Sequence, residues 1–225
     1  MVNKKIVFIL VEGHSDETAL AYFFKMLYNP NEVFVYVEHG DITSQKGVDV
    51  TNIVKNVALR VQKYAKNYKL KNSDFEKIIH IIDTDGAFIP NDSVVFDNCH
   101  PDPLYDITAI KTANVSGIQL RNKTKSSNIQ RLVSTNTIWN IQYKAFYMSC
   151  NLDHVLYNKM NSTDVEKEND SFDFFEKYEN DYNGFLDYIC NSEFSVKLQY
   201  KDSWKFIREG LNSLNRYTNV NLCFA

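Results

Sequence analysis

The sequence has few of the residues that break or cross-link a chain. Its 225 residues include 7 glycines and 4 prolines, too few for a collagen-like or low-complexity protein. The 4 cysteines lack C-x-x-C spacing, so they indicate neither a zinc knuckle nor a disulfide framework. No apolar run approaches the roughly 18 residues of a membrane-spanning helix, and the run at 6–11 is too short for a signal-peptide core. We therefore expect a cytoplasmic protein with reduced thiols and no membrane partner.

An excess of positive charge is also missing. The chain has 25 basic and 28 acidic residues, a net charge of -3, so no global field marks a nucleic-acid binder. The distribution is uneven, however, because residues 107–152 contain six basic side chains and no acidic one. Two interpretations are open: such a segment binds phosphate groups, or it forms ordinary solvated surface. The candidates for weak contacts with a nucleic-acid backbone are Arg121, Lys123, Lys125 and Arg131.

Hydrophobic patterning predicts the fold class. Residues 5–11 are a continuous β-branched and apolar run, typical of a strand buried on both faces, and further strands are expected at 32–38, 77–82 and 143–149. Helical periodicity predicts a first helix from a Ser15 N-cap to about residue 29 and a second helix at 50–68, between the expected strands. Alternating strands and helices predict an α/β fold with a mostly parallel sheet of about four strands flanked by helices.

The rest of the chain predicts the domain organisation. Residues 88–112 hold three of the four prolines and are expected to form an irregular surface excursion, part of a basic insertion near 88–135. A helix is expected at 126–139, and further helices at 152–160, 171–178, 182–191 and 202–216. We expect an α/β core at 1–160 and a helical extension at 161–225 that packs on the core.

Acidic residues directly follow two of the expected strands. Glu12 follows the first strand, and Asp83 and Asp85 follow the third. Ligands of parallel α/β sheets bind at the carboxyl ends of the strands, and residues two apart project to the same side, with Thr84 pointing away. Oxygen ligands of this kind suit Mg²⁺ or Mn²⁺. Glycine at positions 13 and 86 allows a close approach and a sharp turn beside the site.

These two motifs resemble those of a known family. The run Ile-Leu-Val-Glu12-Gly13-His-Ser-Asp16, paired with Ile-Ile-Asp83-Thr-Asp85-Gly86, is similar to the Toprim domain of topoisomerases, primases and phage-defence nucleases. The resemblance covers residues 5 to about 88 and is nearest to standalone RloB-like and overcoming-lysogenization-defect nucleases. It implies a catalytic glutamate at position 12 and a metal-binding pair at positions 83 and 85. Gly13, Asp16 and Gly86 would support that site.

The resemblance also implies an activity. It predicts a Mg²⁺-dependent nuclease acting on RNA or DNA in bacterial phage defence, with an ATPase partner and a homo-oligomer as further possibilities. Glu12 would be a metal ligand, a general base or both. Asp153 and His154, just after the expected fourth strand, are a possible additional ligand or proton shuttle.

Two other readings stay open at this point. The sequence Asp83-Thr-Asp85-Gly86 also resembles the nucleophile motif of the haloacid-dehalogenase phosphatases. That motif normally belongs to the first core strand of the chain, whereas an expected strand–helix–strand–helix stretch precedes it here. Alternatively, the chain is a non-catalytic Toprim-like module that binds a partner through its aromatic, acidic C-terminal helices.

Overall fold

The structure is a computed structural model that describes residues 4–29, 33–99 and 102–224. The chain divides into two compact units, each built from three segments. The first unit contains the chain up to Ile82, Ser127–Phe146 and Ser171–Phe185, and the second contains Asp83–Ser126, Tyr147–Asp170 and the chain from Leu186 onward. The expected boundary at residue 160 therefore lies inside a segment of the second unit.

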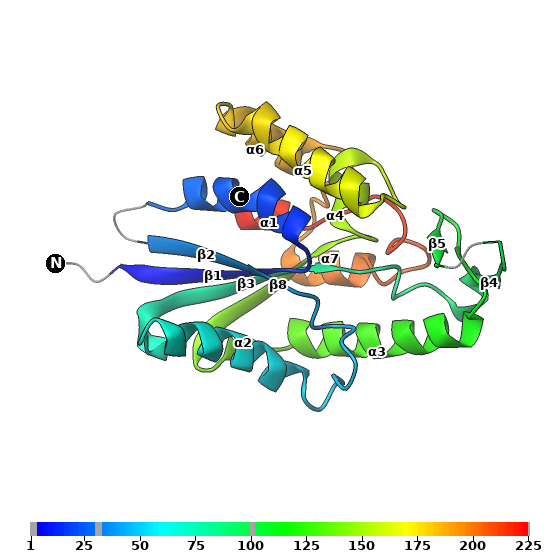
Figure 1. The fold of residues 1–225 in the computed structure, drawn as a ribbon, viewed down its shortest axis with the longest axis horizontal. Coiled ribbons are helices and arrows are strands. Elements are labelled where there is room, and N and C mark those ends of the chain that lie inside the picture. The colour runs from blue at the N-terminus through cyan, green and yellow to red at the C-terminus, as the bar shows by residue number, and fades with distance from the viewer. Residues whose placement is uncertain (1–3, 30–32, 100–101, 225) are drawn as a thin grey trace. The chain divides into compact units, whose positions relative to one another are not determined.

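A five-stranded sheet in the order β2-β1-β3-β8-β7 forms the centre of the first unit (Figure 1). The strands are β1 (Lys5–Val11), β2 (Val33–His39), β3 (Phe75–Asp83), β7 (Thr137–Ile138) and β8 (Ile141–Met148). β1 pairs in parallel with both β2 and β3, whereas β7 and β8 are antiparallel. The predicted α/β class with a mostly parallel sheet is confirmed, with five strands instead of about four. Glu32, the first residue of one expected strand, lies outside the described residues.

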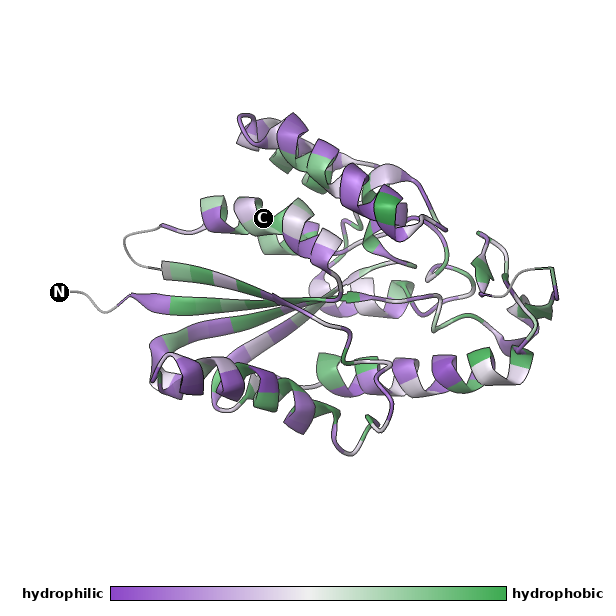
Figure 2. Cartoon of the chain, in the orientation of Figure 1, coloured by the Kyte–Doolittle hydropathy of each residue, from purple (hydrophilic) through white to green (hydrophobic). Residues whose placement is uncertain are grey.

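The burial of β1 explains its central position. Its residues from Val7 to Val11 have no exposed surface, as expected for a strand covered on both faces. Parallel neighbours need crossover connections, which helices α1 (His14–Leu27) and α2 (Ile53–Asn67) provide. Figure 1 shows these helices on opposite faces of the sheet. Figure 2 shows the apolar course of β1 and the mixed polar and apolar faces of α2.

Aromatic side chains join the later helices to α1 within the first unit. Phe23 of α1 stacks on Phe185 at 3.8 Å between ring centroids, and Phe174 packs edge-on against Phe23. These partners come from α5 (Asp164–Tyr178) and α6 (Tyr182–Asn191). The aromatic segment therefore forms part of the core, where burial of large rings is strongly stabilising.

The second unit has a small sheet of its own. Its strands are β4 (Val94–Phe96), β5 (Leu104–Tyr105) and β6 (Ile110–Thr112), in the order β4-β6-β5. They border an apolar cluster formed by Ile89, Val94, Ile110, Ile118 and Leu214. The sequence predicted an irregular excursion here, because strands of two or three residues are too short to show periodicity.

The remaining elements show where sequence periodicity misled. Helix α3 (Val115–Val133) begins and ends earlier than the helix expected at 126–139. The sequence did not reveal its start because the buried face of the helix includes the polar residues Asn122, Lys125 and Asn128, which interrupt the apolar stripe. The other elements are α4 (Leu152–Tyr157), α7 (Tyr200–Phe206), α8 (Asn221–Phe224) and 3-10 turns at Asn72–Asp74 and Asn91–Ser93. Among the helices of the described ranges, none has both the length and the apolarity to cross a membrane.

Candidate functional site

The sheet brings acidic positions to one edge. β2, β1 and β3 are consecutive neighbours that run in parallel, so their carboxyl ends share that edge. Glu12 directly follows β1, Asp83 is the last residue of β3, and Asp41 comes two residues after β2. In open parallel sheets this edge is where ligands bind. Glu12 and Asp83 were expected from the sequence, whereas Asp41 was not.

Within the first unit, Glu12 and Asp41 lie close together. One carboxylate oxygen of each lies within 4.8 Å of the other. The buried hydroxyl of Thr43 donates to Asp41 Oδ1 at 2.8 Å and reaches Glu12 Oε1 at 3.4 Å. Asn128 of α3 donates from Nδ2 to the Thr43 carbonyl at 2.9 Å, which holds this loop against the helix. An acid two residues beyond a strand end, as at Asp41, was the sequence signal available.

Asp16 fixes the backbone next to Glu12. Its Oδ2 accepts hydrogen bonds from the backbone N–H groups of Gly13, at 2.8 Å, and Glu12, at 3.1 Å. Helix α1 consequently begins at His14 with Gly13 as its N-cap, so the expected Ser15 N-cap is wrong. Gly13 has a φ of -121°, which any residue adopts, and an added Cβ there would make ordinary contacts. Asp16 thus positions the Glu12 backbone and also places negative charge at the start of a helix.

In the second unit, the turn at residues 83–86 buries Thr84 between two partly exposed acids. Thr84 is fully buried and donates from Oγ1 to the Ser213 carbonyl at 2.9 Å, while Asp83 and Asp85 are partly exposed. The Asp85 N–H donates to the Cys150 carbonyl at 2.8 Å. The expected convergence of the two carboxylates on one side of the chain stays a prediction.

Gly86 is required by the geometry of this turn. Its φ is +65°, a left-handed conformation that glycine adopts without steric cost. An added Cβ would lie 2.6 Å from Leu214 Cδ2, closer than real side chains approach. Asp85 itself has a φ of +47°, which is uncommon for a residue with a side chain. The turn is thus conformationally restrained where the Asp-x-Asp motif meets the apolar cluster of the second unit.

Basic side chains of α3 contact Asp85. Lys125 is fully buried, and its Nζ lies 2.5 Å from Asp85 Oδ2. Arg121 donates from Nη2 to the Asp85 carbonyl at 2.8 Å and from Nη1 to the Tyr105 hydroxyl at 2.5 Å. Burial, and next the charge of Asp85, raise the pKa of Tyr105 to about 12, so its hydroxyl stays protonated at neutral pH.

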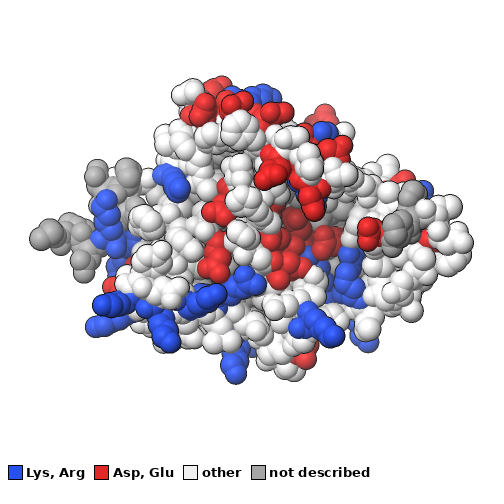
Figure 3. All heavy atoms as spheres, viewed as in Figure 1, with Lys and Arg blue, Asp and Glu red and all other residues white. Residues whose placement is uncertain are grey.

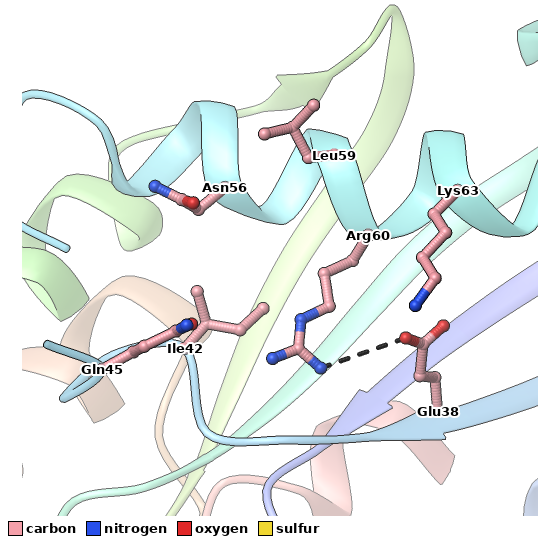
Figure 4. A pocket seen from close by; sticks show the side chains of 7 residues that line it. All are labelled: Glu38, Ile42, Gln45, Asn56, Leu59, Arg60 and Lys63. Atoms are coloured by element: carbon pink, nitrogen blue, oxygen red, sulfur yellow. Dashed lines mark ion pairs between the residues drawn. The ribbon is translucent and has the colours of Figure 1, made fainter. Parts of the chain in front are cut away.

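The basic candidates for nucleic-acid contact divide into two pairs. Arg121 and Lys125 turn toward Asp85, whereas Lys123 and Arg131 are exposed on α3. Whether any of them binds nucleic acid stays a prediction. A separate group of basic side chains gathers over α2 (Figure 3), where Arg60 and Lys63 turn toward Glu38 at a hollow of about 240 Å³ (Figure 4).

Asp153 and His154 are almost fully buried at the start of α4. Asn151 caps this helix by accepting from the His154 N–H at 2.8 Å. Burial, together with the nearby Arg216 charge, lowers the pKa of His154 to about 4, so the imidazole is neutral near pH 7. The suggested ligand or proton-shuttle role of this pair stays a prediction.

Comparison of the chain with models of protein families, with curated proteins and with solved structures gave no match. The likeness to Toprim domains therefore depends on the two sequence motifs.

Proposed function

We propose that this protein is a Toprim-like, Mg²⁺-dependent phosphodiesterase that hydrolyses RNA or DNA. One observation carries the proposal: three neighbouring parallel strands, β2, β1 and β3, each lead into an acid at the same edge of the sheet. Carboxylates that follow neighbouring strands favour the binding of a cation at that edge.

The donor atoms fit a hard divalent cation. Glu12, Asp41, Asp83 and Asp85 offer carboxylate oxygens, the ligands that Mg²⁺ and Mn²⁺ prefer, and Glu12 and Asp41 already lie within reach of each other. Glu12 and Asp41 of the first unit would hold the ion, and the family resemblance adds Asp83 and Asp85 as ligands. When bound, the ion supplies charge for a phosphoryl oxygen and lowers the pKa of water.

The chain's own residues would orient the reaction. Glu12 would accept a proton from the attacking water, because a carboxylate at hydrogen-bond distance is a competent general base. Thr43 holds the Glu12 and Asp41 carboxylates in fixed directions, and Asp16 holds the Glu12 backbone. Lys125 compensates the charge of Asp85 and holds that carboxylate in place.

Substrate and cellular context follow from the family resemblance. The exposed Lys123 and Arg131 are the proposed contacts to the nucleic-acid backbone. Cytoplasmic phage defence, control by an ATPase partner and a homo-oligomeric state are part of the same proposal, and they rest on analogy with Toprim nucleases.

The proposal is tested by incubating the purified protein with tRNA, single-stranded RNA and duplex DNA in Mg²⁺, Mn²⁺ or EDTA. We expect metal-dependent cleavage of at least one substrate, reduced at least about 100-fold by Glu12→Gln or Asp83→Asn. Glu76→Gln is the matched control, because Glu76 is an exposed acid at the opposite end of β3.

Each alternative gives a different result in this experiment. Cleavage that survives Glu12→Gln would contradict the proposed site. Trapping of an aspartyl-phosphate on Asp83 would instead identify a haloacid-dehalogenase-like phosphatase. Loss of partner binding by substitutions in the aromatic helices, with no activity on any substrate, would identify a non-catalytic module.

A further inference from the structure

Two histidines and a glutamate converge beside the start of α1, within the first unit. His14 and Glu17 are three residues apart on α1, so they share one face of the helix, and His39 is the last residue of β2. His39 Nδ1 lies 3.0 Å from Glu17 Oε2, and His14 Nδ1 lies 3.9 Å from the same oxygen. One potential ligand atom from each residue lies within 4.8 Å of the others.

These separations suit one transition-metal ion. Ligand atoms about 2.0–2.1 Å from a tetrahedral Zn²⁺ lie roughly 3.3 Å from one another. The distance from His39 to Glu17 is close to this value, and the His14 side chain needs a movement of under about 1 Å to match it. Two imidazoles and one carboxylate are also the protein ligands of known catalytic zinc sites.

The backbone around the three ligands is well supported. The His39 carbonyl accepts from Arg60 Nη1 at 3.2 Å, and the Gly40 N–H donates to the Val11 carbonyl at 2.9 Å. His14 and Glu17 lie in the first turns of a 14-residue helix. Ligands on a helix and a strand end keep their separation better than ligands on loops.

We propose that His14, Glu17 and His39 bind a first-row transition-metal ion, with Zn²⁺ as the best fit, at a site separate from the strand-end acids. Imidazole ligands favour Zn²⁺ over Mg²⁺, which prefers oxygen. The side chains of His14, Glu17 and His39 are 68%, 34% and 51% exposed, so solvent reaches the remaining coordination position. The ion would link the start of α1 to the end of β2, the segments adjoining Glu12 and Asp41.

The test is calorimetric titration of the full chain with Zn²⁺ in the presence of excess Mg²⁺, followed by the visible spectrum of the Co²⁺-loaded protein. We expect one Zn²⁺ per chain and a tetrahedral or five-coordinate Co²⁺ spectrum without a thiolate charge-transfer band. His14→Gln and His39→Gln should each weaken Zn²⁺ binding at least about 10-fold. Glu76→Gln, which changes an exposed acid at the start of β3, is the control and should leave Zn²⁺ binding unchanged.

Two results would overturn the inference. One is unchanged Zn²⁺ stoichiometry and affinity in the variant that carries both His14→Gln and His39→Gln. The other is a thiolate band in the Co²⁺ spectrum, which would assign the ion to the cysteines, of which Cys99 is exposed. Circular dichroism of each variant separates loss of a ligand from loss of folding. The readout of this test is Zn²⁺ binding, so the absence of a Zn²⁺ site would not contradict the proposed Mg²⁺-dependent activity. Likewise, the absence of nuclease activity would not contradict the Zn²⁺ site.

Discussion

The acids of the first unit and those of the second are held by different kinds of partner. The Thr43 hydroxyl donates to Asp41 at 2.8 Å and lies 3.4 Å from Glu12, and Asp16 accepts from backbone N–H groups. Asp85, in the second unit, contacts the buried ammonium of Lys125. A hydroxyl orients a carboxylate, whereas an ammonium also compensates the charge of the carboxylate. The ammonium beside Asp85 is therefore expected to stabilise the fold of the second unit.

The largest expected effect on stability concerns His154 of the second unit. Its pKa is about 4 in the folded protein, below its ordinary value of 6.5. As the pH falls below 6.5, the unfolded chain takes up the proton first, so the stabilisation is present above pH 6.5 and is lost between pH 6.5 and 4. We expect roughly 3 kcal/mol of the free energy of unfolding to disappear over this range.

Urea unfolding of the wild type and of His154→Gln, at several pH values between 7 and 4, measures this contribution. The difference in the free energy of unfolding between the wild type and His154→Gln should become smaller as the pH falls. A difference in the free energy of unfolding that does not change with pH would show that burial does not keep the imidazole neutral.

The ion pair of Lys125 gives the next largest effect. Lys125→Met removes the ammonium and leaves the Asp85 carboxylate, which is 26% exposed, to partial solvation. Loss of one partner of a fully buried pair costs about 3–5 kcal/mol, and the partial exposure of Asp85 reduces our expectation to about 2 kcal/mol. Lys123→Met, on the exposed side of the same helix, is the matched control and should change the free energy of unfolding by less than about 0.5 kcal/mol. If Lys125→Met and Lys123→Met lowered the free energy of unfolding equally, the ion pair with Asp85 would not stabilise the second unit.

Two glycines of the second unit separate backbone strain from packing. Gly86 and Gly210 both have positive φ, +65° and +53°, but only at Gly86 does an added Cβ meet a neighbouring atom, Leu214 Cδ2. Alanine at either position costs about 1–2 kcal/mol for the backbone. We expect Gly86→Ala to cost at least about 1 kcal/mol more than Gly210→Ala, from overpacking. Thermal unfolding of both variants measures the difference, and equal costs would show that Leu214 moves aside freely.

The smallest expected effect belongs to the first unit. Glu12→Gln removes one of two carboxylates that lie within 4.8 Å, so it relieves repulsion. We expect the free energy of unfolding, measured without divalent ions, to stay within about 0.5 kcal/mol of the wild type or to rise. A loss of more than about 2 kcal/mol would show that Glu12 has a structural role and would contradict the comparison.

The sequence predicted the parts of the fold that repeat a simple pattern. The apolar run of β1 gave its bounds correctly, because a strand covered on both faces needs an uninterrupted run of this kind. The start of α3 was missed because that helix buries polar side chains such as Lys125 and Asn128. Those side chains are satisfied by partners far away in the sequence, which no local pattern can reveal.

The candidate site, like the fold, was predictable only where a strong local pattern marks its residues. Glu12 and Asp83 follow strands with strong apolar runs, so their position at the sheet edge could be inferred. Asp41 lies in a polar loop after β2 and joins Glu12 only through tertiary packing, including the bond from Asn128 to Thr43. The cluster of His14, Glu17 and His39 likewise requires the pairing of β2 with β1.

The proposed enzyme requires that Glu12, after β1, and Asp83, at the end of β3, bind the same Mg²⁺ ion. Calorimetric titration of Mg²⁺ into the wild type, Glu12→Gln, Asp83→Asn and the control Glu76→Gln tests this directly. We expect Glu12→Gln and Asp83→Asn each to weaken the same binding event at least about 10-fold, and the control to leave it unchanged. Wild-type Mg²⁺ affinity in either Glu12→Gln or Asp83→Asn would contradict a shared ion and, with it, the proposed enzyme.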